Sequence, residues 1–239
     1  MMMSIILIYF SWKYNGDWDK IYEALDEKEK VSLKDANFIE QKINSKEWRC
    51  ITILDFEYPN ALKECYKPPF TIWLKGDEKL LSKNMICLTG NQIDDKTFDY
   101  LKNFVKSSTE NKILISPSFK GVDQEVDKIN DKNPKVIVLA NGFDKPYINS
   151  NINDADLLIS EYPPHANVSK NKLRARNRLI AAFADLLVLF SSKRNGGMEN
   201  MVNNFLNQGK EINCFPGDGS DEDGNTEFIR QGANLITKI

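Results

Sequence analysis

A short, strongly basic segment is the part of this sequence best suited to bind a ligand. Five of the nine residues from 170 to 178 are basic, and no acidic residue occurs from 163 to 183. The apolar residues that follow, Leu179, Ile180 and Phe183, have helical spacing, so the basic segment opens a helix. Cations are unfavourable near a helix N-terminus, and a solvated helix face usually mixes charges of both signs. This local conflict predicts a surface that binds an anion.

The side chains of this segment have the chemistry of phosphate recognition. Arginine presents paired N–H donors that match phosphate oxygens, and asparagine can hydrogen-bond a base or a sugar. The candidate binding residues of the segment are Lys170, Lys172, Arg174, Arg176, Asn177 and Arg178.

Three loops could also approach a phosphate, because each follows a predicted strand and precedes a helix. A glycine at such a place lets the backbone come close to the ligand, although an ordinary turn explains it equally well. In the second loop, Asp123 could cap the next helix and hold the loop in place. The third loop, 195–199, contains two adjacent glycines and is equally open to both interpretations. The candidate binding residues of the first two loops are Gly90, Ser116, Lys120 and Gly121.

From about residue 70, short apolar runs alternate with helical stretches. The run 136–139 is apolar on both faces, as in a buried parallel strand. This alternation predicts an α/β fold with an extended Rossmann-like, doubly wound and mostly parallel sheet. Such sheets bind ligands beyond the carboxyl ends of their strands, where the candidate loops should meet. The predicted strands are Thr71–Leu74, Met85–Thr89, Lys112–Ser116, Val136–Ala140, Leu157–Ile159, Leu186–Phe190 and Ile212–Phe215, and the predicted helices include Lys96–Lys106 and Gly197–Asn207.

Residues 1–65 are predicted to form a small helical region, ahead of a main domain at 66–239. Apolar residues recur there at helical spacing, and Ser32 can cap a helix that begins at Leu33. The apolar start, 1–12, is too short to span a membrane and has no basic leader, so we expect a packed first helix in a cytoplasmic protein.

Composition narrows the function further. The net charge is −2, from 32 basic and 34 acidic residues, so any binding of nucleic acid must come from a local patch. The four cysteines are scattered and His165 is the only histidine, which excludes a zinc site of the usual spacing and a serine triad. We therefore expect no metal, no cofactor, no membrane association and no enzymatic activity.

From about residue 50 to the end, several motifs in the correct order resemble those of the DprA/Smf family of DNA-processing proteins. No single motif is specific, but together they are. The motifs are Asp55 to Leu62, Pro68-Pro69, Leu74 to Gly76, Asn141 to Asp144 with Tyr147 and Asn151, Glu161 to Pro164, Arg176 to Ala181, Pro216-Gly217, Gly224-Asn225 and Gly232 to Ile236.

The resemblance implies a Rossmann-like protein, usually dimeric, that binds single-stranded DNA, protects it and hands it to the recombinase RecA during natural transformation. It implies phosphate contacts from Arg176 and Arg178, with Asn177 lining the pocket. It also implies that Gly90, Ser116 and Gly121 shape the floor of the pocket, and that Lys172 or Arg174 extends it.

The sequence departs from the family pattern in ways that leave other hypotheses open. The family's Gly-Ser-Arg turn reads Gly90-Asn91-Gln92, so one phosphate-binding arginine is missing, and Asp127 replaces a usual histidine. One alternative is a nucleoside-monophosphate phosphoribohydrolase, whose glycine-rich loop is faintly echoed at 196–199. Another is a degenerate member of the family that retains only a protein–protein role.

Overall fold

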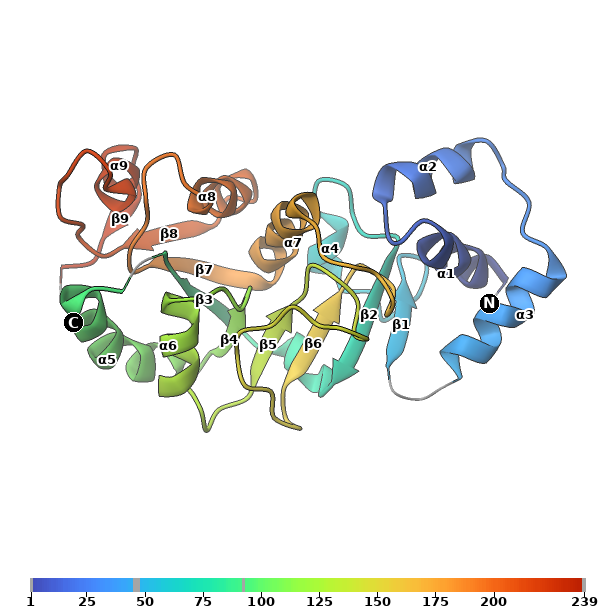
Figure 1. The fold of residues 1–239 in the computed structure, drawn as a ribbon, viewed down its shortest axis with the longest axis horizontal. Coiled ribbons are helices and arrows are strands. Elements are labelled where there is room, and N and C mark those ends of the chain that lie inside the picture. The colour runs from blue at the N-terminus through green and yellow to red at the C-terminus, as the bar shows by residue number, and fades with distance from the viewer. Residues whose placement is uncertain (1, 45–47, 92, 238–239) are drawn as a thin grey trace.

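A single mixed sheet forms the backbone of the molecule. The computed structural model describes residues 2–44, 48–91 and 93–237, and nine strands of this part pair in the order β1-β2-β6-β5-β4-β3-β7-β8-β9 (Figure 1). Their bounds are β1 (Arg49–Thr52), β2 (Thr71–Gly76), β3 (Met85–Thr89), β4 (Ile113–Ser116), β5 (Lys135–Val138), β6 (Leu157–Ser160), β7 (Ala184–Leu189), β8 (Glu211–Cys214) and β9 (Asn234–Leu235).

The sheet is doubly wound, as the sequence predicts. The strands from β6 to β9 in this order pair in parallel, whereas β2 is antiparallel to β6 and β1 is antiparallel to β2. The chain builds β3, β4, β5 and β6 in one direction and then crosses back to place β7 on the other side of β3. The strand order therefore reverses between β3 and β7, where sheets of this kind bind their ligands.

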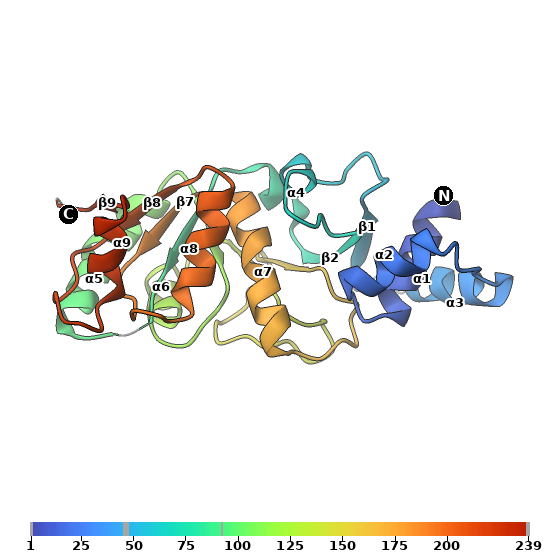
Figure 2. The same ribbon diagram turned by 90° about the horizontal axis from the view of Figure 1, so that it is seen from above.

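Helices cover both faces of the parallel part of the sheet (Figures 1 and 2). On one face, α7 (Lys170–Phe183) and α8 (Met198–Asn207) pack over alternate strand residues such as Met85 and Cys87. On the other, α5 (Asp95–Thr109) and α6 (Val122–Ile129) cover Ile86 and Leu88. Because successive side chains of a strand point to opposite faces, burial of both faces explains the continuous apolar runs. The remaining helices of the main domain are α4 (Asn60–Lys63), the 3-10 helix η1 (Glu78–Ser82) and α9 (Gly224–Arg230).

The N-terminal helices α1 (Met2–Lys13), α2 (Trp18–Asp26) and α3 (Leu33–Ile43) pack at the β1 end of the sheet (Figure 1). Ser32 caps α3 as predicted, because its side chain accepts a hydrogen bond from the backbone N–H of Asp35. The predicted helical region, 1–65, differs in its last part, since residues 49–52 form β1 of the main sheet and α4 contacts α7 of the main domain. None of the described helices is both long and apolar enough to cross a membrane.

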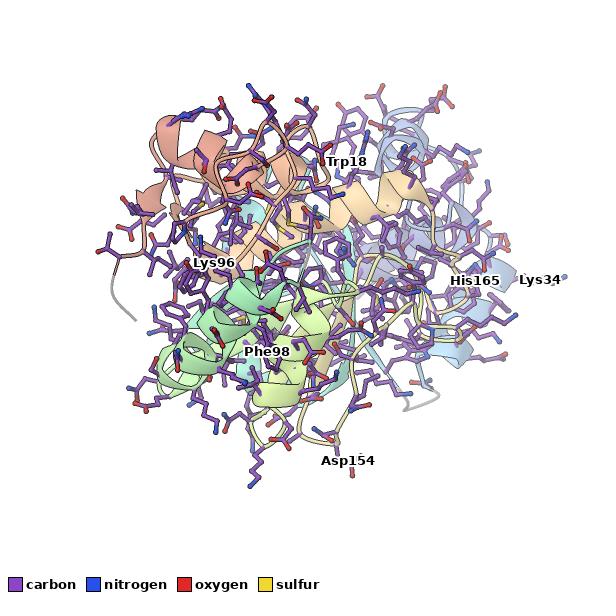
Figure 3. All side chains as sticks on the ribbon, turned by 60° about the vertical axis from the view of Figure 1, so that its left-hand side comes forward. Trp18, Lys34, Lys96, Phe98, Asp154 and His165 are labelled. Carbon is purple, nitrogen blue, oxygen red and sulfur yellow. The ribbon has the colours of Figure 1, made fainter. Side chains whose placement is uncertain are left out.

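Aromatic contacts join the N-terminal helices to the main domain, among them those of Trp12 with Trp73 and of Trp18 with Phe70. The rings of Trp12 and His165 lie 4.5 Å apart, and Figure 3 shows His165 beside these helices. His165 belongs to the turn that leads into α7, so the N-terminal region packs next to the start of the basic segment.

A buried ion cluster ties β5 to α6 and to the loop before β6. The ammonium group of Lys135, a residue only 1% exposed, lies 2.6 Å from Asp127 Oδ1 and 3.5 Å from Asp156 Oδ2. Asp156 also accepts the backbone N–H of Lys135, and Asp127 accepts that of Asn151. Asp127, which replaces the usual histidine of the family, therefore has a structural role here.

Replacing Lys135 with Met should lower the free energy of unfolding by about 3 to 5 kcal/mol, because two buried carboxylates lose the cation that compensates them. Urea denaturation measures the change. Lys128→Met is the matched control, since Lys128 forms a 2.5 Å pair with Glu125 at the surface. Loss of such an exposed pair should cost less than about 1 kcal/mol. Equal effects in the two variants would contradict the role assigned to the cluster.

Candidate functional site

The loops that follow β3 and β7 meet at the carboxyl edge of the sheet. The backbone N–H of Asn91 donates to Ser191 O at 3.0 Å, and that of Lys193 donates to Asn91 Oδ1 at 3.1 Å. A Cβ atom on Gly90 would lie 2.8 Å from Ser191 O, so only glycine allows this approach. Gly90 therefore serves the packing of two loops, and Gln92 of the same turn lies outside the described residues.

The basic segment begins α7 at the same edge. Ser169 caps the helix by accepting the backbone N–H of Lys172 at 3.3 Å. From the second turn, Arg176 reaches the loop after β4, where its Nη1 donates to Pro117 O at 2.8 Å. Its guanidinium carbon also lies 4.7 Å from the centre of the Phe119 ring. The segment and the β4 loop are thus brought together, as predicted.

Arg176 itself is inside the protein. Only 1% of the residue is exposed, and its Nε and Nη2 have no hydrogen-bond partner in the described part of the chain. Burial lowers the pKa of the Arg176 guanidinium to about 10, although the nearby Asp123 carboxylate opposes this change. In this conformation the Arg176 side chain is inaccessible to solvent and to a ligand at the surface.

Asp123 is the buried acid that holds the β4 loop. It accepts hydrogen bonds from Thr89 Oγ1 at 2.6 Å and from the backbone N–H of Phe119 at 2.9 Å, and Ser116 Oγ lies 3.4 Å from it. Burial raises the pKa of the Asp123 carboxyl to about 6. The prediction that Asp123 caps α6 is wrong, because Gly121 occupies the cap position and Asp123 lies within the first turn.

Ser116 shares the interior with Asp123. It is 3% exposed, and its hydroxyl accepts the backbone N–H of Ser118 at 2.9 Å. Ser116 therefore stabilises the turn at 116–118 from the protein interior and does not face solvent.

Arg178 forms a two-pronged ion pair with Glu161. Its Nη1 lies 2.9 Å from Glu161 Oε1, and its Nη2 lies 2.5 Å from Oε2. It also donates to the backbone carbonyl groups of Tyr66 and Lys67. Burial opposes the charge, but the Glu161 carboxylate outweighs it and raises the pKa of Arg178 above its usual value. The guanidinium therefore links α7 to β6 and to the segment after α4.

Asn177 points toward the neighbouring helix. Its Nδ2 donates to Asn200 Oδ1 on α8 at 2.9 Å, and the residue is 3% exposed. Its Oδ1 has no hydrogen-bond partner among the described residues.

The remaining candidates are accessible cations. Lys170 and Arg174 are exposed on α7, and Lys120 is exposed on the β4 loop. Lys172 is partly buried, with its ammonium group 4.4 Å from the centre of the Tyr162 ring, and burial lowers its pKa. Within the described part of the chain, none of these four side chains forms an ion pair. The structure thus divides the candidates into a buried group and an exposed group.

The loop after β7 has a different electrostatic setting. It runs beside the acidic segment 218–223: Lys193 pairs with Asp223 through the backbone, and the backbone N–H of Arg194 donates to Glu222 O. The Arg194 side chain lies 3.7 Å from Glu227. These acids offset the positive charge of this loop, so among the candidate segments the unpaired cations of the described residues lie on α7 and the β4 loop.

The described residues contain no group of His, Cys, Asp and Glu side chains that could hold a metal ion. The site offers the exposed positive charge of Lys120, Lys170 and Arg174. Sequence reasoning missed the roles of Phe119 and Glu161 as partners of the two buried arginines. The sequence did contain a signal that Arg176 is buried. Arg176, Ile180 and Phe183 have the spacing i, i+4 and i+7, so Arg176 lies on the apolar face of the helix.

The fold defines a Rossmann-like α/β protein of the doubly wound type. Within that class, the chain belongs to the DNA recombination-mediator protein A family, whose model matches residues 49–239. It is 29% identical to the DNA processing protein DprA of Bacillus subtilis over 214 residues, which cover 84% of this chain and 70% of the relative. Identity to the Streptococcus pneumoniae DprA is 27% over 197 residues, covering 78% and 70%.

Two solved structures share the fold. The DprA structure from Streptococcus pneumoniae superposes with a TM-score of 0.73 at 21% identity, covering 98% of this chain and 90% of that chain. The DNA processing protein A from Helicobacter pylori gives 0.70 at 18% identity, covering 80% and 92%, and its structure concerns a single-stranded DNA binding mode of that protein. The resemblance seen in the sequence motifs is therefore confirmed at the level of family and fold.

Asp123 should make stability depend on pH in a recognisable way. Because its folded-state pKa of about 6 exceeds that of an unfolded aspartate, its contribution to stability is present at low pH and is lost as the pH rises through about 4 to 6. Relative to Asp123→Asn, the wild-type free energy of unfolding should fall by about 2 kcal/mol between pH 4 and pH 7. Urea denaturation across this range measures the difference.

Asp94→Asn is the control for this measurement. Asp94 caps α5, and its hydrogen bond from the Thr97 backbone lowers the pKa of the Asp94 carboxyl. Its contribution to stability is therefore lost as the pH falls, which is the opposite sign. A wild-type curve parallel to that of Asp123→Asn would contradict the assignment.

Proposed function

We propose that this protein binds single-stranded DNA, without enzymatic turnover, through the exposed cations at the carboxyl edge of its sheet. The observation that carries the proposal is that Lys170 and Arg174 are exposed on α7, the helix that Arg176 joins to the loop of Lys120, and that no described acid pairs with these three cations. Lys170 and Arg174 lie four residues apart and share one face of α7. Family membership and the DNA binding of the Helicobacter pylori relative support the choice of ligand.

The chemistry of the ligand follows from the kind of charge on this surface. Lysine and arginine side chains neutralise phosphates and release the cations that surround them, so affinity should fall as salt rises. Contacts of this kind carry little sequence information, and we expect slight sequence preference. Because the whole chain is slightly acidic, attraction must be limited to this patch.

In this proposal the two buried arginines position the binding surface and do not contact the DNA themselves. Arg176 holds the β4 loop through Pro117 O, and Arg178 fixes α7 to Glu161. Lys170, Arg174 and Lys120 contact the phosphates directly in this proposal, and Lys172 extends the surface that they form. The phosphate contacts that the resemblance implies for Arg176 and Arg178 stay predictions that would require the β4 loop or α7 to move.

The wider role that we propose follows from the family. The protein would protect incoming single strands and load a RecA-type recombinase on them during natural transformation, acting in the cytoplasm as a homodimer. The family's description as a recombination mediator supports this role.

Replacing Lys170 and Arg174 together with Ala should weaken binding to an oligo-dT probe at least tenfold, because two phosphate contacts are lost. Fluorescence anisotropy at several salt concentrations measures this. The slope of log K against log salt should become shallower by about 0.7 for each lost phosphate contact.

Lys102→Ala with Lys106→Ala is the matched control, since it removes the same charge from α5 on the opposite face of the sheet. An equal loss of affinity in both double variants, or none in the first, would reject the proposed surface. Release of free base from a nucleoside monophosphate would favour the phosphoribohydrolase alternative. Absence of DNA binding with preserved self-association would favour the protein–protein alternative.

A further inference from the structure

The loop between β5 and β6 is attached at one end to the turn before α7. The backbone N–H of Gly142 donates to Ala166 O at 2.8 Å, and that of Asp144 donates to Pro164 O at 2.9 Å. A Cβ atom on Gly142 would lie 2.1 Å from the carbonyl oxygens of both Pro163 and Pro164, so this close approach requires glycine. The first part of the loop is therefore held against the chain that leads directly into Lys170.

The other end of the same loop is attached to the β4 loop. Asn149 donates to Ser118 twice, from its backbone N–H to Oγ at 2.8 Å and from Nδ2 to the carbonyl oxygen at 2.8 Å. Ser118 Oγ in turn donates to Ser150 Oγ at 2.9 Å. Ser118 has a φ of +54°, an unusual conformation for a residue with a side chain, which these bonds hold in place. This end is thus fixed two residues from Lys120.

Tyr147 lies between these two attachments. Its backbone N–H donates to Oδ1 of the buried Asn141 at 3.1 Å, so its position along the loop is fixed. Its side chain is nevertheless 45% exposed, and within the described part of the chain no other aromatic ring stacks on it. The two attachments place the loop that carries Tyr147 between the turn before α7 and the β4 loop.

We propose that Tyr147 stacks on a nucleobase of the bound strand while Lys170, Arg174 and Lys120 hold the phosphates on either side. This inference rests on the proposed function and adds a base contact to it. Aromatic side chains within a basic groove are the usual means of holding single strands, because every base has a face on which a ring can stack. A backbone that is already fixed loses little further freedom on binding, which favours such a contact.

The contact also accounts for a preference for single strands. Bases in a duplex are stacked on each other and are not available to Tyr147, whereas its neighbouring cations would attract the phosphates of either form. Tyr147 would therefore select the form of the nucleic acid, and the cations would supply most of the affinity.

Two probes with the same number of phosphates separate the parts of the site: an oligo-dT strand and an abasic strand of equal length. Tyr147→Ala should weaken binding to oligo-dT about tenfold, the effect of losing one base stack, and leave binding to the abasic strand unchanged. Tyr147→Phe should bind both probes like the wild type, because the ring is retained. The Lys170 and Arg174 double variant should lose affinity for both probes.

Ile152→Ala is the matched control, because Ile152 is 47% exposed in the same loop but lies beyond both attachments. If the wild type binds both probes and Tyr147→Ala binds oligo-dT as tightly, the base contact is rejected while the proposed function stands. An equal loss for both probes in Tyr147→Ala would also reject it, since the loop would then act on the cations. If the wild type binds neither probe, the proposed function fails and the base contact fails with it.

Discussion

The burial of a charged guanidinium at Arg176 is the constraint on which the carboxyl edge of the sheet depends. A buried charge is costly unless polar groups surround it, and here Pro117 O, the Phe119 ring and the Asp123 carboxylate provide that environment. Asp123 in turn receives hydrogen bonds from Thr89 at the end of β3 and from the β4 loop. The charge of Arg176 therefore helps to set the relative positions of β3, the β4 loop, α6 and α7.

This arrangement separates two properties that the basic segment combines in sequence. Arg176 and Arg178 are buried and use their charge to join elements of the fold. Lys170 and Arg174 are directed away from the core and keep their charge available. The conflict between basic residues and the positive end of the helix dipole is thus resolved in part internally, through Glu161 and Asp123, and in part by leaving two cations to solvent.

Much of the fold could be predicted from the sequence, because strands buried on both faces read as continuous apolar runs and the basic segment has a clear helix start at Ser169. The strand β1 could not, since its sequence Arg-Cys-Ile-Thr is short and mixed and pairs only through contact with β2. The meeting of the basic segment with the β4 loop was implied by the family resemblance, which assigns both to one pocket. The burial of Arg176, Asn177 and Arg178 was not, because composition shows that a helix is basic but not which acids from distant segments will pair with it.

The double attachment of the loop after β5 has an evolutionary consequence. Because Gly142 is held against the turn before α7 and Asn149 is held against Ser118, the chain between them has to span a set distance. The side chains of Phe143 and Asn149 are constrained as well, because Phe143 is buried and Asn149 bonds to Ser118, and an insertion or a deletion would break one attachment or the other. Among relatives that keep both attachments, this loop should therefore stay constant in length, unlike ordinary surface loops.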